Sequence, residues 1–145
     1  MTISSTAVVL DTMVVSAILN GTRDPVLAAT YRSLIGGRLT VVSFVTITEL
    51  RYGVMRANWG ELRRRGLERD LTRLVIVQPD DELMQICAEL RASCERDGHG
   101  LGQKIHEADR WIAATAITLN VPLISNDTIF SDVPNLVAES SDTSA

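Results

Sequence analysis

Short apolar runs alternate with longer amphipathic segments along most of the chain. Continuous apolar runs bounded by turn residues are typical of strands buried on both faces of a parallel sheet. We expect four such strands, at residues 7–10, 39–44, 74–77 and 121–125, and a fifth, edge strand at 133–137. Helices are expected between them, including residues 12–19, 25–35, 58–74 and 106–119. Strands that alternate with helices indicate an α/β domain with a mainly parallel sheet of four to five strands.

The segment at residues 106–119 gives the strongest helix prediction. Apolar residues recur along it at helical spacing and predict one buried stripe, made of Ile105, Ile112, Ala116 and Leu119. Asp109 lies near the start of this helix, where a carboxylate favours the positive end of the helix dipole. Position alone therefore leaves two interpretations of Asp109 open, a helix-stabilising charge or a member of a functional site.

Length and composition are those of one ordinary globular domain. The chain has 145 residues, of which 46% are apolar and 22% charged, enough for a single substantial core. We expect one domain at residues 1–138 and a polar, disordered tail at 139–145. No apolar run approaches the roughly 18 residues that span a bilayer, and the first six residues carry no basic side chain. The expectation is a cytoplasmic protein without a secretory signal or a membrane segment.

The cysteines and histidines argue against a redox or zinc site. Cys87 and Cys94 fall on the apolar stripe of one predicted helix, so buried thiols are expected. The only histidines, His99 and His106, lack the paired spacing of metal ligands.

Charge is distributed unevenly along the chain. The net charge is −4, but seven arginines and only three acids lie between Arg51 and Arg73. That segment carries a net charge of +4, which leaves −8 for the remainder. Within the segment a helix is predicted at 58–74, with a possible interruption at Gly66. Its arginines either guide a nucleic-acid backbone, engage a protein partner, or form a solvated face with salt bridges such as Glu61 to Arg65.

Four carboxylates occupy positions that a parallel sheet brings to one edge. Asp11 ends the first predicted strand and Asp127 follows the fourth, while Glu49 and Asp109 lie on helices that pack beside these strand ends. Converging carboxylates repel one another, so a bound cation is the natural compensation. Ligands that are all oxygen suit Mg²⁺ or Mn²⁺ better than zinc. We therefore expect Asp11, Glu49, Asp109 and Asp127 to be both catalytic and metal-binding residues.

Four short motifs carry a family resemblance. They are Val-Val-Leu-Asp11-Thr12, Thr48-Glu49-Leu50-Arg51-Tyr52-Gly53, Asp109-Arg-Trp-Ile-Ala-Ala-Thr-Ala and Leu123-Ile-Ser-Asn-Asp127. In this order and at these spacings they resemble the PIN domain family, and most of all its bacterial VapC toxin branch. The resemblance runs from about Val8 to Asp127.

The resemblance implies a three-layer α/β/α fold and a Mg²⁺-dependent endoribonuclease, usually a homodimer, that a cognate VapB antitoxin neutralises. It assigns the acidic positions to Asp11, Glu49, Asp109 and Asp127, and less firmly places supporting hydroxyl or amide groups at Thr12, Ser125 and Asn126. Met13 is a departure, since many relatives have a polar residue there. As the resemblance suggests, in-line attack on RNA should leave a 5′-phosphate and a 3′-hydroxyl.

Other functions stay open. A phosphatase with an Asp-x-Asp pair would need an acid at Met13, and a receiver domain would need adjacent acids and a late lysine, whereas the only lysine is Lys104. A PIN-type nuclease that acts in RNA processing or on structured DNA remains an alternative. So does a non-catalytic α/β interaction domain whose carboxylates bind a structural ion or cap helices. The sequence does not choose among transfer, ribosomal and messenger RNA as substrate.

Overall fold

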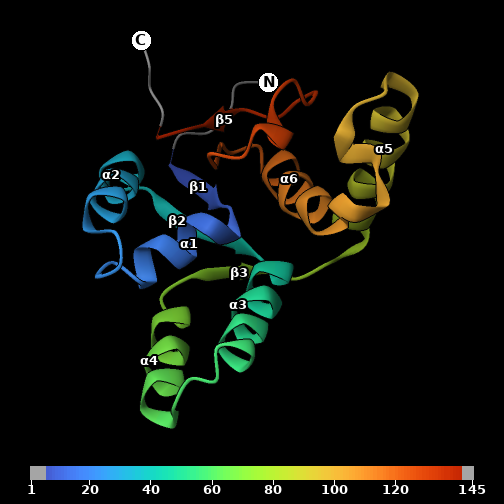
Figure 1. The fold of residues 1–145 in the computed structure, drawn as a ribbon. Helices are drawn as coiled ribbons and strands as arrows, with labels where there is room; N and C mark the ends of the chain where they lie inside the picture. The colour runs from blue at the N-terminus through green and yellow to red at the C-terminus, as the bar shows by residue number, and fades with distance from the viewer. Residues whose placement is uncertain (1–5, 142–145) are drawn as a thin grey trace.

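A single parallel sheet organises the computed structural model, which describes residues 6–141 (Figure 1). The strand order is β3-β2-β1-β4-β5, so the first strand lies in the centre. All four strand pairings are parallel. The strands are β1 (Ala7–Leu10), β2 (Leu39–Ser43), β3 (Val75–Val77), β4 (Leu123–Ile124) and β5 (Ala138–Glu139). The predicted α/β class with a parallel sheet is confirmed.

Helical crossovers connect the first four strands, as parallel pairing requires. Each of the first three crossovers consists of two α-helices, and short 3-10 helices occupy the loops around α6. The α-helices are α1 (Thr12–Leu19), α2 (Pro25–Ile35), α3 (Phe44–Arg56), α4 (Glu61–Leu71), α5 (Asp81–Asp97) and α6 (Glu107–Leu119). The 3-10 helices are η1 (Gly100–Gly102), η2 (Lys104–His106) and η3 (Thr128–Phe130).

The sheet separates two apolar cores, which gives the three layers. Val8 and Leu10 of β1 point into one core, with residues of α1 to α4, while Val9 points into the other, with residues of α5 and α6. This alternation follows from the period of two along a strand. Figure 1 shows α1 and α2 on one side of the sheet and α5 and α6 on the other. The predicted three-layer α/β/α arrangement is therefore confirmed.

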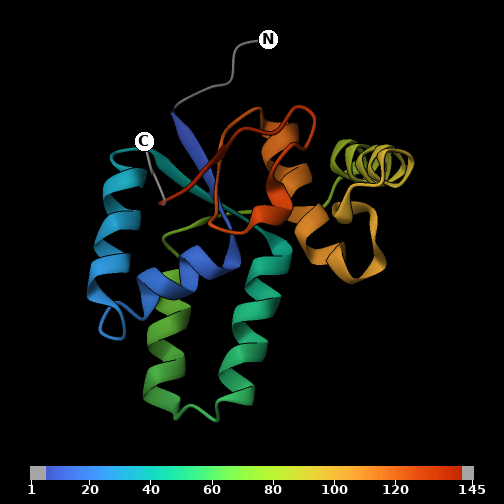
Figure 2. The same cartoon turned by 45° about the horizontal axis from the view of Figure 1, so that its top comes forward.

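Helices α3 and α4 form a hairpin that projects away from the sheet, with α1 across its base (Figure 2). The sequence predicted one helical stretch at 58–74 with a possible break at Gly66. The structure instead starts α4 at Glu61 and runs it without interruption through Gly66. Gly66 adopts no positive φ, so it weakens the helix slightly without ending it.

Two apolar positions of the predicted stripe on α6 are exposed. Ile105 lies in η2, ahead of the helix, and is 84% exposed, and Leu119 is 41% exposed. The other two positions, Ile112 and Ala116, are buried as predicted. Burial continues around the helix there, because the consecutive residues Ile112, Ala113, Ala114, Thr115 and Ala116 are all buried.

The fifth strand forms later in the chain than the sequence predicted. Residues 133–137 turn instead of extending, because Pro134 lies between Asp132 and Asn135, which both have positive φ. Val133 is apolar because it is buried in the core beside α6, not because it belongs to a strand. The edge strand is β5, which pairs with β4 in the register Leu123 to Ala138.

The expected tail from 139 is ordered as far as the structure describes it. Glu139 belongs to β5, and its carboxylate accepts two hydrogen bonds from Arg38, at 2.9 and 2.8 Å. The same guanidinium donates to the carbonyls of Leu34 and Ile35 at the end of α2. The domain therefore extends past residue 138, and residues 142–145 lie outside the described part.

We expect Arg38→Ala to lower the free energy of unfolding by about 1–2 kcal/mol, because this half-buried, bidentate ion pair also satisfies helix-end carbonyls. Arg65→Ala is the matched control. It removes an exposed ion pair with Glu61, which should be worth less than about 0.5 kcal/mol. Urea unfolding of both variants measures the difference, and equal losses would contradict a structural role for β5.

Cys87 and Cys94 are both buried and free on α5, as expected. Burial raises the pKa of both thiols, so they remain protonated and unreactive near neutral pH. Between residues 6 and 141, no helix is both long and apolar enough to cross a bilayer.

Candidate active site

Asp11 is the centre of the candidate site, at the carboxyl end of the central strand β1. Its backbone is still extended, and its side chain caps α1, which starts at Thr12. One carboxylate oxygen accepts the backbone N–H of Thr12 at 2.8 Å, and the other accepts the hydroxyl of Ser125 at 2.7 Å. Asp11 is only 5% exposed, so a negative charge is held where little water reaches it.

Burial is the main reason that the pKa of Asp11 is raised from 3.8 to about 6. The charges of Asp109 and Asp127 raise it further, while the hydrogen bonds from Ser125 and Thr12 lower it. Within residues 6–141, the groups that shift this pKa include no cation. Its ionised form is therefore destabilised in the protein alone, which is the condition that a bound cation would relieve.

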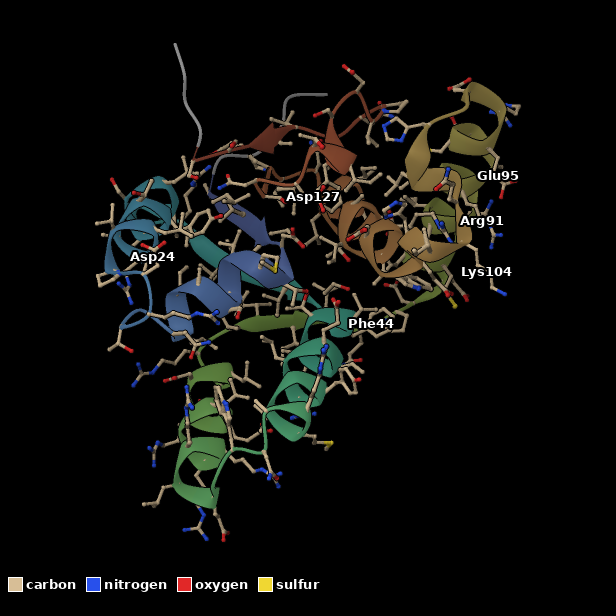
Figure 3. All side chains as sticks on the ribbon, viewed as in Figure 1. Asp24, Phe44, Arg91, Glu95, Lys104 and Asp127 are labelled. Carbon is tan, nitrogen blue, oxygen red and sulfur yellow. The ribbon has the colours of Figure 1, made fainter. Side chains whose placement is uncertain are left out.

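The loop after β4 places Ser125 and Asp127 beside Asp11. Ser125 is buried, and its hydroxyl oxygen accepts the backbone N–H of Asp127 at 3.0 Å while it donates to Asp11. Asp127 is exposed and caps η3 through the backbone N–H of Ile129. Figure 3 shows Asp127 near the carboxyl end of the sheet. Ser125 thus fixes the spacing between the two carboxylates.

Glu49 reaches the site through a pair of threonines. Thr12 donates its hydroxyl to Glu49 at 2.8 Å. Because that uses the only proton of Thr12, the buried hydroxyl of Thr46, at 3.0 Å, donates to Thr12 in turn. Glu49 itself is exposed, and it is not among the groups that raise the pKa of Asp11. The chain Thr46–Thr12–Glu49 ties the start of α3 to the start of α1.

Asp109 lies in the first turn of α6, half-buried, and pairs with His106. The distance between His106 Nδ1 and Asp109 Oδ2 is 2.9 Å. Sequence reasoning considered His106 only as a zinc ligand and missed this contact. The spacing of three residues at a helix start was the available signal, because such residues share one face.

The loop that carries His106 is tied to α6 from inside. Arg110 is 3% exposed, and its guanidinium donates to the carbonyls of Leu101 and Gln103 at 2.9 and 2.5 Å. At Gly102 the loop touches the end of α5 so closely that a Cβ would lie 2.7 Å from the backbone nitrogen of Glu95. Only glycine fits there, and the loop path to His106 is fixed as a result.

An aromatic contact joins the two helices that carry Glu49 and Asp109. Phe44, at the start of α3, meets Trp111, one turn into α6, edge to face with 5.2 Å between ring centroids. Figure 3 labels Phe44 where α3 begins, beside α6. Such a pair adds about 0.5–1.5 kcal/mol beyond its buried area, and it holds both helix starts toward the sheet edge.

The other three predicted acids thus differ in how they interact with Asp11. Asp109 and Asp127 act electrostatically on Asp11, whereas Glu49 is linked only through Thr12. Within residues 6–141, no three carboxylate, imidazole or thiol groups are close enough together to form a metal-binding cluster as they stand. The donor set is nevertheless rich in oxygen and carries uncompensated negative charge at buried Asp11, which fits a hard divalent cation.

Asn126 has a different environment from the other supporting residues. Its amide donates to the hydroxyl of Ser141, and its carbonyl oxygen accepts from Ser140 and from the backbone of Ser141. In this structure its side chain holds the segment after β5.

The arginines between Arg51 and Arg73 differ in their partners. Arg51 pairs with Glu68, and Arg65 with Glu61, both on the exposed surface. Arg63 instead lies over the ring of Trp59. The predicted salt-bridged face therefore exists, but it uses only part of the positive charge.

The family model for the PIN domain matches residues 8–136. Ribonuclease VapC2 from Rickettsia felis is 31% identical over 102 residues, which cover 70% of this chain and 73% of that protein. The chain belongs to the PIN domain family, in its VapC branch.

Solved structures agree with this assignment. VapBC2 from Rickettsia felis, bound to a DNA fragment from its promoter, superposes with a TM-score of 0.75 at 26% identity, covering 92% of this chain and 98% of that one. VapBC-1 from nontypeable Haemophilus influenzae gives a TM-score of 0.73 at 23% identity, covering 93% and 98%. The first supports the family assignment, and the second supports the fold alone.

Proposed function

We propose that the chain is a Mg²⁺-dependent endoribonuclease of the VapC toxin type, which hydrolyses RNA phosphodiester bonds and so inhibits translation and growth. The observation that carries the proposal is the buried Asp11 carboxylate, whose pKa of about 6 reflects burial and the charges of Asp109 and Asp127. If Asp11 only capped α1, it would not need two further carboxylates close enough to raise its pKa. The name of the curated relative, a ribonuclease, supports RNA as the substrate.

The residues that would hold the cation are Asp11 and Asp109, with Glu49 and Asp127 completing the site through water. All four present carboxylate oxygens, the donors that Mg²⁺ and Mn²⁺ prefer. When bound, the cation would supply charge stabilisation at the phosphate oxygens and a more acidic water.

The side chains around these acids orient them for that task. Ser125 and the backbone of Thr12 each occupy one oxygen of Asp11, so the carboxylate cannot rotate freely. His106 holds one oxygen of Asp109. Thr12 donates to only one oxygen of Glu49, Oε1. The other oxygen of Glu49, Oε2, would accept a proton from the attacking water. Fixing these groups before substrate arrives lowers the reorganisation needed in the transition state.

The same family relationship supports a protein partner. The solved relative from Rickettsia felis is a VapBC protein, and another structure, 26% identical, is described as a member of the VapBC family of toxin–antitoxin systems from Mycobacterium tuberculosis. We propose a cognate VapB-type antitoxin for this chain and a homodimer as its active form. The antitoxin would neutralise the nuclease.

The function is tested with purified protein and a single-stranded RNA, with DNA of the same sequence as control. We expect RNA cleavage in Mg²⁺ that stops in EDTA, and products with a 5′-phosphate and a 3′-hydroxyl. Mapping of 5′ ends in cellular RNA after brief induction would then identify the target. Cleavage that persists in EDTA, or equal cleavage of DNA, would contradict the proposal.

A further inference from the structure

A groove runs along α1, α3 and α4 from the candidate active site. Its volume is about 480 Å³. Thr12 and Glu49 line it at the acidic end, and Arg23, Trp59 and Arg63 line it at the other. The groove is therefore continuous with the site and not a separate cavity.

Helices α1 and α3 place negative charge at one end of the groove and positive charge at the other. Helix α1 starts at Thr12 and α3 passes Glu49, and the hydrogen bond between these two residues joins the helices at the acidic end. From Glu49 to Ala57, another lining residue, α3 extends about 12 Å. Arg23 follows the far end of α1. The groove thus leads from carboxylates to cations over the length of a short single-stranded segment.

Arg63 is held in a defined orientation at the cationic end. Its guanidinium carbon lies over the Trp59 ring, 3.7 Å from the ring centroid, well within the range of a cation–π contact. Trp59 is itself half-buried against the core, so the platform is fixed. Arg63 as a whole is exposed.

Neither groove arginine is neutralised by an acid. Of the ion pairs that the structure describes, those of arginine involve Arg38, Arg51, Arg65 and Arg91, but not Arg23 or Arg63. An unpaired, preorganised guanidinium is suited to a phosphate, and its plane is suited to a nucleic-acid base.

We infer that this groove binds the single-stranded RNA next to the scissile phosphate, with a base stacked on the Trp59-supported Arg63 and the backbone contacted by Arg23. The inference rests on the proposed function and adds a subsite to it. Single-stranded RNA matches the three features of the groove: continuity with the carboxylates, free positive charge, and a flat surface for a base.

The test compares Arg63→Gln with Arg64→Gln. Both variants remove one exposed, unpaired arginine from α4, but Arg64 lines two other hollows, one along α4 and one between α3 and α4, and not the groove. Binding of an RNA of about twelve nucleotides is measured in EDTA at several salt concentrations, and cleavage is measured in Mg²⁺. Arg63→Gln should weaken binding about tenfold, reduce the salt slope by about one, and raise KM with kcat unchanged. Arg64→Gln should change affinity less than about twofold.

Arg63→Lys separates charge from stacking. Lysine keeps the salt slope but lacks the flat guanidinium, so its affinity should fall between wild type and Arg63→Gln. Full rescue by lysine would overturn the stacking role of Arg63.

The remaining outcomes identify which proposal fails. Equal losses in Arg63→Gln and Arg64→Gln, or none in either, would overturn the subsite while RNA cleavage by wild type upholds the function. A loss of affinity for the co-expressed antitoxin, with RNA binding unchanged, would overturn it in favour of a protein-docking groove. Wild-type protein that neither binds nor cleaves RNA would overturn both proposals.

Discussion

Asp11→Asn should reduce Mg²⁺-dependent RNA cleavage by about 10³-fold or more, with the fold intact. The substitution keeps the size of the side chain and one acceptor oxygen, so the cap on Thr12 can persist. It removes the charge that the cation and the developing phosphate charge depend on. Asp109→Asn should have the same effect, because its charge acts on the same site.

Glu107→Gln is the matched control for these substitutions. Glu107 is exposed in the first turn of α6, as close to the helix dipole as Asp109, but it does not act on Asp11. Initial rates with one RNA, together with melting temperatures, separate catalysis from stability. Wild-type turnover by either asparagine variant with normal Mg²⁺ dependence would remove that residue from the site.

The second large effect concerns stability in EDTA as a function of pH. Folding raises the pKa of Asp11 from 3.8 to about 6, so between these values the folded state binds more protons than the unfolded state. The contribution of Asp11 to stability therefore falls as pH rises through this window and stays low above it. The difference amounts to as much as about 3 kcal/mol. Asp11→Asn cannot titrate, so between pH 4 and pH 7 its free energy of unfolding should rise relative to that of wild type by about 2–2.5 kcal/mol.

Mg²⁺ should restore the lost stability of wild type at neutral pH. An ion that binds only the folded site stabilises by about 2.7 kcal/mol at 100 times its dissociation constant. Asp109→Asn, with a weakened site, should gain much less and should lose little stability in EDTA. Equal increases of melting temperature in wild type and Asp109→Asn would show that Asp109 is a charge that favours the helix dipole and not a ligand.

The sequence was sufficient for the strands that carry the site. The buried run that ends at Asp11 could be predicted because strands covered on both faces leave few polar positions. The helix with Asp109 in its first turn was equally clear from spacing and alanine content. Both were confirmed as elements of the fold, whereas the metal and the catalytic roles of their acids stay predictions.

Contacts between segments that are distant in the chain could not be predicted from the sequence. Thr46 is one hydroxyl among many until α3 is placed beside α1, where it supports Thr12. Val133 led to the prediction of a strand because apolar side chains are buried in loops as well as in strands. Glu139 looked like part of a polar tail, since only the fold brings Arg38 within reach of it.

The hydrogen bond from Ser125 to Asp11 joins residues 114 positions apart. A chain is made from its N-terminus at about 5–20 residues per second, so Asp11 precedes its partner by roughly 6 to 23 s. Throughout that interval the growing chain contains Asp11 but not β4, Ser125 or Asp127, which complete its surroundings. Any activity that needs this arrangement begins only after Ser125 and Asp127 have been made. The central position of the first strand thus makes assembly of the candidate site wait for segments that are made much later.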